Sequence, residues 1–134
     1  MSASVLKRLI GNRSGALASE FALVLPVFTA IVVAVLQFGW GQHCAGSVRF
    51  ALEQASRSMI IDPSMSDDAV RTLVLSKLNA GTAAETTVTV QRAAGAGGVV
   101  ATLTGVYVHD IGVPMLAHFP FRYTNTVSTP LPAS

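Results

Sequence analysis

The hydrophobic pattern begins with a long apolar run that predicts one membrane-spanning helix. Residues 21–48 contain no Asp, Glu, Lys or Arg, and about 20 helical residues cross the hydrocarbon core of a bilayer. We expect one helix over residues 16 to about 60, with a transmembrane part over residues 16–41. Pro26 lies inside it and predicts a kink, because proline lacks the N–H that a helix interior uses. Trp40, at the end of the run, is typical of a membrane interface.

Over residues 42–61 the pattern becomes amphipathic. Five apolar residues recur at spacings of three and four, which places them on one stripe of a helix. Arg49, Glu53 and Arg57 recur every four residues on another face, where ion pairs stabilise a helix. Pro63 ends the helix, because the residue before a proline is displaced from helical angles. The apolar stripe consists of Ala45, Val48, Leu52, Ala55 and Met59.

A short second helix and three strands are predicted in residues 62–134. Ser66 is suited to cap the start of that helix and Gly81 to cap its end. From Thr86 the hydrophobic period changes to two, which predicts antiparallel strands. The fold class is therefore α+β: a long N-terminal helix, a short second helix and a small three-stranded antiparallel sheet. The strands span about 86–92, 98–108 and 119–128, and Gly95-Ala96-Gly97-Gly98 forms the first hairpin turn.

The connection between the last two predicted strands holds several polar and apolar residues. We expect His109, Asp110 and His118 to lie in this loop. The segment 111–119 is too apolar for a freely exposed loop. Two interpretations stay open: the segment covers the core of the sheet, or it contacts a neighbouring subunit or the bilayer surface.

Composition and charge narrow the classes of function. Hydrophobic residues make up 51% of the chain and charged residues 12%, and the apolar excess lies mostly in residues 16–61. Residues 1–15 hold three of the nine basic residues and none of the seven acidic ones, so the rest has a net charge of −1. No basic patch remains that would favour nucleic acid as a partner. The single cysteine, Cys44, is expected to be a buried apolar residue; an intermolecular disulfide is the alternative.

The start of the apolar run carries a more specific pattern. Ser14 to Pro26 reads S-G-A-L-A-S-E-F-A-L-V-L-P, and Leu36-Gln37-Phe38-Gly39 follows. This pattern resembles the TadE-like minor pseudopilins of tight-adherence (Flp-type) pili, which typically read G-x-x-x-x-E-F-A-L-V-L-P and then a second motif similar to E-F-G. In this chain Gln37 replaces the acidic residue of the second motif. The resemblance is specific from Ser14 to about Gly41.

The resemblance implies that the chain is a prepilin. A prepilin peptidase would remove a disordered leader, residues 1–15, by cleaving between Gly15 and Ala16, and residues 62–134 would form a periplasmic pilin-like head. A glycine lets the peptide lie extended in a protease active site. The basic residues upstream favour a cytoplasmic N-terminus and a single pass through the bacterial inner membrane. No small-residue site for ordinary secretory cleavage follows the run; an uncleaved signal anchor is the alternative.

Glu20 and Phe21 are the predicted assembly residues. A carboxylate at the membrane boundary is costly and normally marks a partner or a function. After cleavage, Glu20 could pair with the α-amino group of Ala16 in its own chain or, as the resemblance implies, in a neighbouring subunit. The alternative is that the carboxylate only favours the N-terminus of its own helix.

The expected function is structural. The resemblance implies a minor pseudopilin that is incorporated into, or initiates, a tight-adherence pilus and supports surface attachment. Its implied partners are the prepilin peptidase, a second minor pseudopilin, the major Flp-type pilin, the inner-membrane assembly platform and the lipid bilayer. A type II secretion pseudopilin and a membrane-anchored periplasmic binding module that does not assemble are alternatives.

No catalytic residue, metal site or cofactor is expected. His43 and Cys44 are adjacent and diverge by about 100° on a helix, so they cannot bind a metal from one face. The serines lack the Gly-x-Ser-x-Gly turn of a hydrolase nucleophile.

Overall fold

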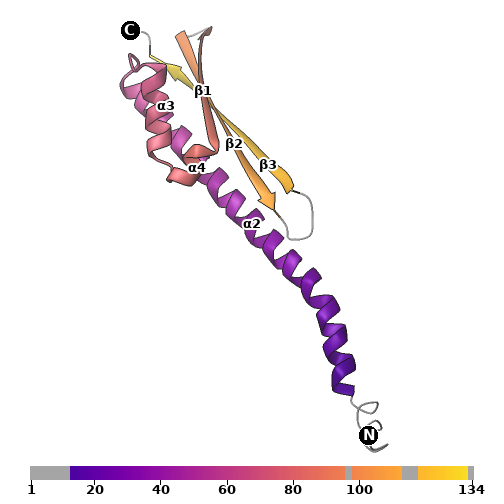
Figure 1. Ribbon diagram of the computed structural model, residues 1–134. Helices are drawn as coiled ribbons and strands as arrows, with labels where there is room; N and C mark the ends of the chain where they lie inside the picture. Colours follow the sequence, from indigo (N-terminus) through magenta and orange to yellow (C-terminus); the bar gives the residue numbers. More distant parts are fainter. Residues whose placement is uncertain (1–12, 96–97, 113–117, 133–134) are drawn as a thin grey trace, which may run out of the picture.

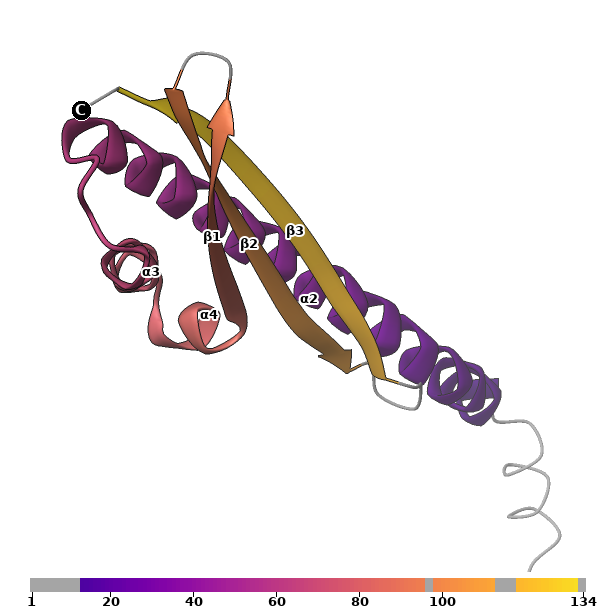
Figure 2. The same ribbon diagram turned by 90° about the horizontal axis from the view of Figure 1, so that it is seen from above.

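The computed structural model describes residues 13–95, 98–112 and 118–132, with side chains from residue 18 onward. The long helix α2 (Arg13–Ile61) lies along one face of a three-stranded antiparallel sheet, and the short helices α3 (Asp67–Ser76) and α4 (Ala80–Ala84) lie beside the first strand (Figure 1). Figure 2 shows the same two layers from above. The predicted α+β fold is confirmed.

Helix α2 starts earlier than expected and ends as expected. It comprises 49 residues, or about 73 Å at 1.5 Å per residue. Because it begins at Arg13, the end of the predicted leader is helical rather than disordered. Its last residue, Ile61, precedes Asp62 and Pro63, and the Asp62 carboxylate accepts hydrogen bonds from the backbone N–H and the hydroxyl of Ser64 at 3.1 and 2.6 Å. These bonds turn the chain away from the helix axis.

The C-terminal part of α2 supplies the core. The predicted stripe is confirmed, because its five residues are each at most 1% exposed. They pack against the inward face of the sheet, where Leu103 and Tyr107 are fully buried. On the opposite face of the helix, Arg49 Nε lies 2.9 Å from Glu53 Oε1 in the ion pair that the spacing predicted. The stripe consists of Ala45, Val48, Leu52, Ala55 and Met59.

The strands β1 (Thr86–Gly95), β2 (Gly98–Gly112) and β3 (His118–Leu131) pair in the order β1-β2-β3. The second and third are longer than predicted, because their pairing continues without a break to Gly112 opposite His118. The prediction that His109, Asp110 and His118 lie in a loop is therefore wrong.

The first hairpin turn has the expected position. Gly95 pairs with Gly98, and the two residues between them lie outside the described residues. Gly98 has a φ of 131°, which favours glycine.

The second helix is divided in two. Ser66 caps α3 as predicted, because its hydroxyl accepts a hydrogen bond from Ala69 N at 3.2 Å. The predicted cap at Gly81 is wrong: α3 ends before Lys77, and Gly81 lies inside α4. The side chain of Asn79 accepts a hydrogen bond from Thr82 N at 2.8 Å. This capping bond starts a new helix where the sequence predicted an end.

At Gly105 the backbone of the sheet lies close to the side chains of α2. A Cβ atom at this position would lie 2.9 Å from Leu52 Cδ1 and 3.0 Å from Val48 Cγ1. Because these contacts are shorter than van der Waals separations, the absence of a side chain lets the helix rest on β2.

Candidate membrane and assembly interface

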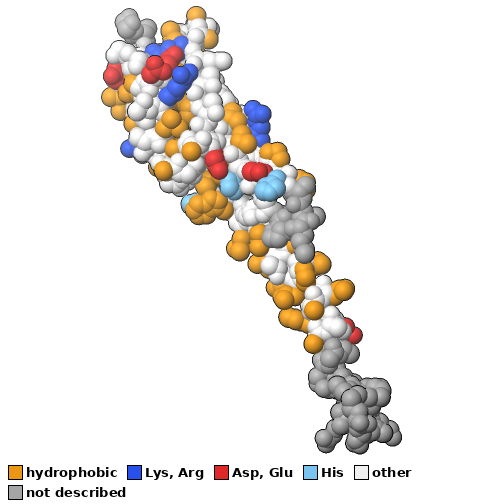
Figure 3. All heavy atoms as spheres, in the orientation of Figure 1, with side chains coloured by type: hydrophobic (Ala, Val, Ile, Leu, Met, Phe, Trp, Pro, Cys, Tyr) orange, Lys and Arg blue, Asp and Glu red, His pale blue; other side chains and the backbone are white. Residues whose placement is uncertain are grey.

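The N-terminal part of α2, Ala18–Trp40, has an apolar surface that the head contacts only near its C-terminal end, at Gln37 and Phe38; we call it the bare segment. Except for the half-buried Val33, its large hydrophobic side chains are between 39% and 80% exposed, from Val32 to Leu23. Figure 3 shows apolar side chains along this part of the helix, whereas charged side chains gather over the head. Among the described residues, α2 is the one helix that is long and apolar enough to cross a membrane, with a mean hydropathy of 2.5 over its most apolar window.

The exposure of the bare segment requires a covering. A helix that is apolar on all sides is stable when lipid or protein surrounds it. The helix is therefore consistent with a single-pass membrane anchor.

Glu20 lies at the N-terminal end of the bare segment and is exposed, as is Phe21 beside it. Among the described residues, Glu20 has no hydrogen-bond or ion-pair partner. The backbone of Gly15 and Ala16 belongs to the same helix, so residue 16 lies one turn before Glu20, about 6 Å along the axis. Helical side chains tilt toward the N-terminus. The Glu20 side chain is thus directed toward the turn of the helix that contains residue 16.

Pro26 and Trp40 both lie on this surface. Helix α2 continues through Pro26, and the Thr29 hydroxyl donates a hydrogen bond to the Leu25 carbonyl oxygen at 2.8 Å. The kink at Pro26 stays a prediction. Trp40 is 56% exposed, and its ring centroid lies 5.9 Å from that of His43. Its place in a membrane interface also stays a prediction.

A contact that the sequence pattern did not reveal joins the bare segment to the end of the second hairpin. The Gln37 side-chain amide donates a hydrogen bond to the carbonyl oxygen of Gly112 at 2.6 Å. The rings of Phe38 and Phe121 meet edge to face at a centroid distance of 5.8 Å. Gly41 is buried below the same ring, since a Cβ atom there would lie 3.3 Å from Phe121 Cδ1. The available signal was one amide side chain, Gln37, within an otherwise apolar run.

A partly buried polar cluster lies where α2, α4 and β2 meet. Cys44 is 1% exposed, as predicted for an apolar packing residue, and its sulfur accepts a hydrogen bond from the Thr82 hydroxyl at 3.3 Å. Burial raises the pKa of the Tyr107 phenol above its usual range, and hydrogen bonding to Cys44 and Glu85 reinforces the shift. Glu85 Oε2 also lies 2.9 Å from His109 Nδ1. A thiol this deeply buried cannot reach another chain unless the core opens.

The described residues contain no group of three or more His, Cys, Asp or Glu side chains that could hold a metal ion. The two His–carboxylate pairs, His109 with Glu85 and His118 with Asp110, each join two residues only. They link neighbouring segments at the end of the sheet that faces the bare segment.

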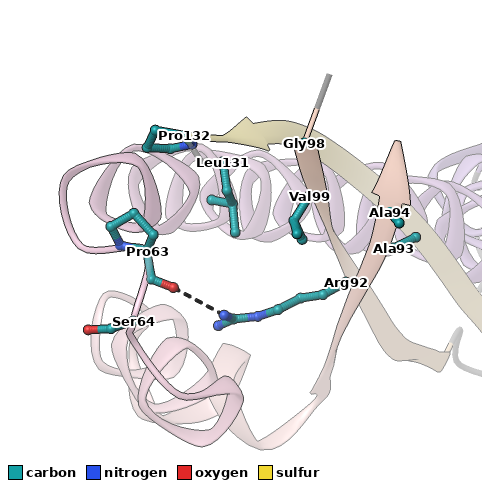
Figure 4. Close-up of a pocket in the computed structure, with 9 residues that line it drawn as sticks. All are labelled: Pro63, Ser64, Arg92, Ala93, Ala94, Gly98, Val99, Leu131 and Pro132. Atoms are coloured by element: carbon teal, nitrogen blue, oxygen red, sulfur yellow. Dashed lines mark hydrogen bonds between the residues drawn. The ribbon is translucent and has the colours of Figure 1, made fainter. Parts of the chain in front are cut away.

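A pocket of about 680 Å³ lies at the opposite end of the head (Figure 4). Its charged side chain, Arg92, is already hydrogen-bonded within the protein. The guanidinium donates to Asp67 Oδ1 at 3.0 Å, to the Pro63 carbonyl oxygen at 3.2 Å and to the Met65 carbonyl oxygen. Arg92 therefore ties the turn after α2 to β1, and this is a structural role that the sequence did not reveal.

The comparison with protein families agrees with the N-terminal motif. Residues 15–57, about a third of the chain, match the family model described as TadE-like protein. The match confirms the resemblance drawn from the motif, and it includes Gly15, Glu20 and Gln37. No curated protein and no solved structure gives a significant match.

Proposed function

On the strength of this match to the TadE-like family, we propose that the chain is a minor pseudopilin of a tight-adherence pilus. The family supports a pilus-associated protein with a structural rather than a catalytic role. The observation that carries the proposal is the bare segment, which is continuous with the helix that forms the core of the head. Such a helix needs lipid around it before assembly and the helices of other subunits around it afterwards.

Processing creates the group that Glu20 would bind. A prepilin peptidase removes residues 1–15, and the new α-amino group belongs to Ala16. Because both residues at the cleavage site lie in α2, the peptidase has to unwind the first turn before the backbone can bind in an extended form. Gly15 lowers the cost of this step, since glycine is among the poorest helix formers.

Assembly then uses the charge of Glu20. The Ala16 ammonium group of a neighbouring subunit pairs with the Glu20 carboxylate at the edge of the apolar layer, where an unpaired charge is costly. Residues 21–48 offer no other charged side chain, so the pairing also sets the register between neighbouring helices. Phe21, which is 65% exposed, packs beside the pair.

The remaining parts of the proposal follow from topology. The basic residues before the apolar run favour a cytoplasmic N-terminus, which places residues 62–134 in the periplasm. Partners of the mature chain are a second minor pseudopilin, the major Flp-type pilin and the inner-membrane assembly platform. In this arrangement the protein initiates the pilus or is incorporated into it, and so supports surface attachment.

The test compares two carboxylates on the same helix. Glu20→Ala and the control Glu53→Ala are expressed as full chains together with the other pilus components. Both variants are expected to lose the leader, so that each has the mass of a mature chain whose first residue is Ala16. Glu20→Ala should fail to co-purify with pilus components, because the ammonium group of its neighbour lacks a partner, whereas Glu53→Ala should co-purify normally. Glu20→Gln, which keeps hydrogen bonding but not charge, should be intermediate.

Two results would contradict parts of the proposal. Normal co-purification of cleaved Glu20→Ala would mean that the carboxylate only favours its own helix terminus. A mature mass corresponding to cleavage near residue 46 would indicate an ordinary secreted protein instead of a pseudopilin.

A further inference from the structure

We propose that the end of the β2–β3 hairpin is a second membrane-contacting element, which enters the outer lipid boundary beside α2. We call the residues 109–112 and 118–121 the hairpin end. The inference rests on the membrane insertion of α2 in the proposed function. It adds a second point at which the head touches the bilayer.

The hairpin end extends beyond the rest of the sheet. Strand β1 begins at Thr86, opposite Tyr107, so past this point β2 and β3 continue as a two-stranded ribbon. Figures 1 and 2 both show this ribbon running along α2 toward its N-terminal half. It reaches the bare segment at Gln37 and Phe38.

This contact lies at the depth of the lipid boundary. If the hydrocarbon core begins at Phe21, about 20 helical residues place its outer limit near Trp40. Gln37 then lies about 4.5 Å inside that limit along the helix axis. Because Gln37 donates to the carbonyl oxygen of Gly112 at 2.6 Å, the end of β2 lies at the same depth.

A stripe of reduced exposure on α2 supports the same placement. Val33, Ala34 and Gln37 are half-buried among exposed neighbours, and the stripe continues to the buried Gly41. These residues recur at helical spacing on the side where Gln37 and Gly41 contact the hairpin end. The hairpin end therefore contacts the last turn of the apolar run, at Gln37 and Phe38.

The side chains of the hairpin end suit lipid on one face and head groups on the other. Phe119 pairs with Ile111 across the strands. It is two residues from Phe121, so both side chains lie on the same face of the strand, the face turned toward α2. Phe119 is nevertheless 55% exposed, which means that it does not cover the core of the sheet. On the opposite face, Asp110 and His118 form an exposed ion pair at 3.0 Å. Residues 113–117 lie outside the described residues and carry no formal charge in the sequence.

The bond between Gln37 and Gly112 is what a strand end needs in an apolar layer. A backbone carbonyl without water must find a donor within the protein, because an unpaired polar group is costly there. An amide can donate, whereas an ionised carboxylate can only accept. Gln37, the residue that departs from the second family motif, is therefore the residue type that can hold this strand end against α2.

Lipid is the occupant that the observations favour over a second copy of the chain. The exposed face of Phe119 is continuous with the bare segment through Phe38 and Phe121, and burying a phenylalanine side chain in an apolar surrounding is favourable. One covering can therefore bury both surfaces without a further binding site.

The test measures the depth of single tryptophans. Trp40 is the only tryptophan, so Trp40→Phe gives a background into which Phe119→Trp is introduced. Phe28→Trp, in the middle of the bare segment, is the control for lipid contact. Phe50→Trp is the control for water, since Phe50 is 62% exposed and lies about 15 Å beyond Trp40 along the helix. The full-length variants are reconstituted in phosphatidylcholine vesicles whose acyl chains carry bromine at depths from the head group to the middle of the bilayer.

We expect Phe119→Trp to lose more than half as much fluorescence as Phe28→Trp, and Phe50→Trp to lose little. If Phe28→Trp is quenched and Phe119→Trp behaves as Phe50→Trp does, the inference fails and the proposed function stands. If Phe28→Trp is not quenched, α2 is not in the membrane, and the proposed function fails as well.

A second variant tests the hydrogen bond. Gln37→Leu keeps the helix apolar but removes the donor to Gly112, so quenching at Phe119→Trp should fall while quenching at Phe28→Trp is unchanged. Gln42→Leu, which removes an amide outside the contact, should change neither. Unchanged quenching at position 119 in Gln37→Leu would overturn the role of this bond.

Discussion

The two halves of α2 are equally helical but have opposite environments. In the bare segment Leu36 is 67% exposed, whereas in the C-terminal half Leu52 is fully buried under the sheet. The C-terminal half confines its apolar residues to one stripe, and its other face carries the Arg49–Glu53 ion pair. The bare segment is apolar on every side. The comparison shows that the distribution of apolar residues around a helix, more than their number, indicates whether one face or the whole helix is covered.

The electrostatics of the two halves differ in the same way. Hydrogen bonding to Glu53 raises the pKa of Arg49, which is fully exposed to solvent. No ionisable side chain occurs between Phe21 and Gln42. The C-terminal half of α2 can therefore face water on one side, whereas the bare segment has no polar face.

The largest expected effect comes from truncating one leucine in each half. Leu52→Ala should lower the free energy of unfolding by about 2–5 kcal/mol, because it leaves a cavity between α2 and the sheet. Leu36→Ala should leave it nearly unchanged, since Leu36 is 67% exposed and lies outside the buried core. Denaturant unfolding of the full chain in detergent micelles, followed by circular dichroism, measures both. An equal loss in Leu36→Ala would show that the bare segment also stabilises the head.

A smaller effect is expected from adding one methyl group to a glycine in each environment. Gly105→Ala should cost about 1–3 kcal/mol, because the new Cβ would overlap Leu52 and Val48 in a packed core. Gly39→Ala meets nothing within 4 Å and should not destabilise the protein, since alanine is the better helix former. Thermal unfolding of the two variants side by side is the measurement. Similar melting temperatures would contradict the close approach at Gly105.

The smallest expected effect is a loss of stability at high pH, caused by ionisation of the buried Tyr107 phenol under the C-terminal half of α2. The pKa of Tyr107 is raised in the fold, so its contribution to stability is present below the unfolded pKa near 10 and is lost as the pH rises above it. The loss should reach about 1.4 kcal/mol by pH 11. Tyr107→Phe should remove this part of the alkaline decline, and Tyr123→Phe should keep it. The measurement is the denaturation midpoint of each variant between pH 8 and 11. If Tyr107→Phe loses stability with pH as steeply as the unchanged protein does, ionisation of Tyr107 is not the cause.

Local rules determined a large part of the molecule from the sequence alone. The uncharged run, the stripe from Ala45 to Met59 and the alternation of Val88 and Val90 each depend on residues near one another in the chain, so their periods predict helix and strand directly. The cap at Ser66 and the end of α2 before Pro63 depend on one or two residues. The motif around Gly15 and Glu20 likewise indicated the family before the fold was known.

Only the tertiary structure decided how the distant parts meet. The hydrogen bond from Gln37 to Gly112 joins residues 75 positions apart, and no local pattern encodes such a pair. Strand register likewise decides how far β2 and β3 extend past their predicted ends. The reversal of the chain after α2 brings Arg92 to its three hydrogen-bond acceptors. Periodicity shows which face of an element is apolar, but the surface that covers it follows from the packing of the whole chain.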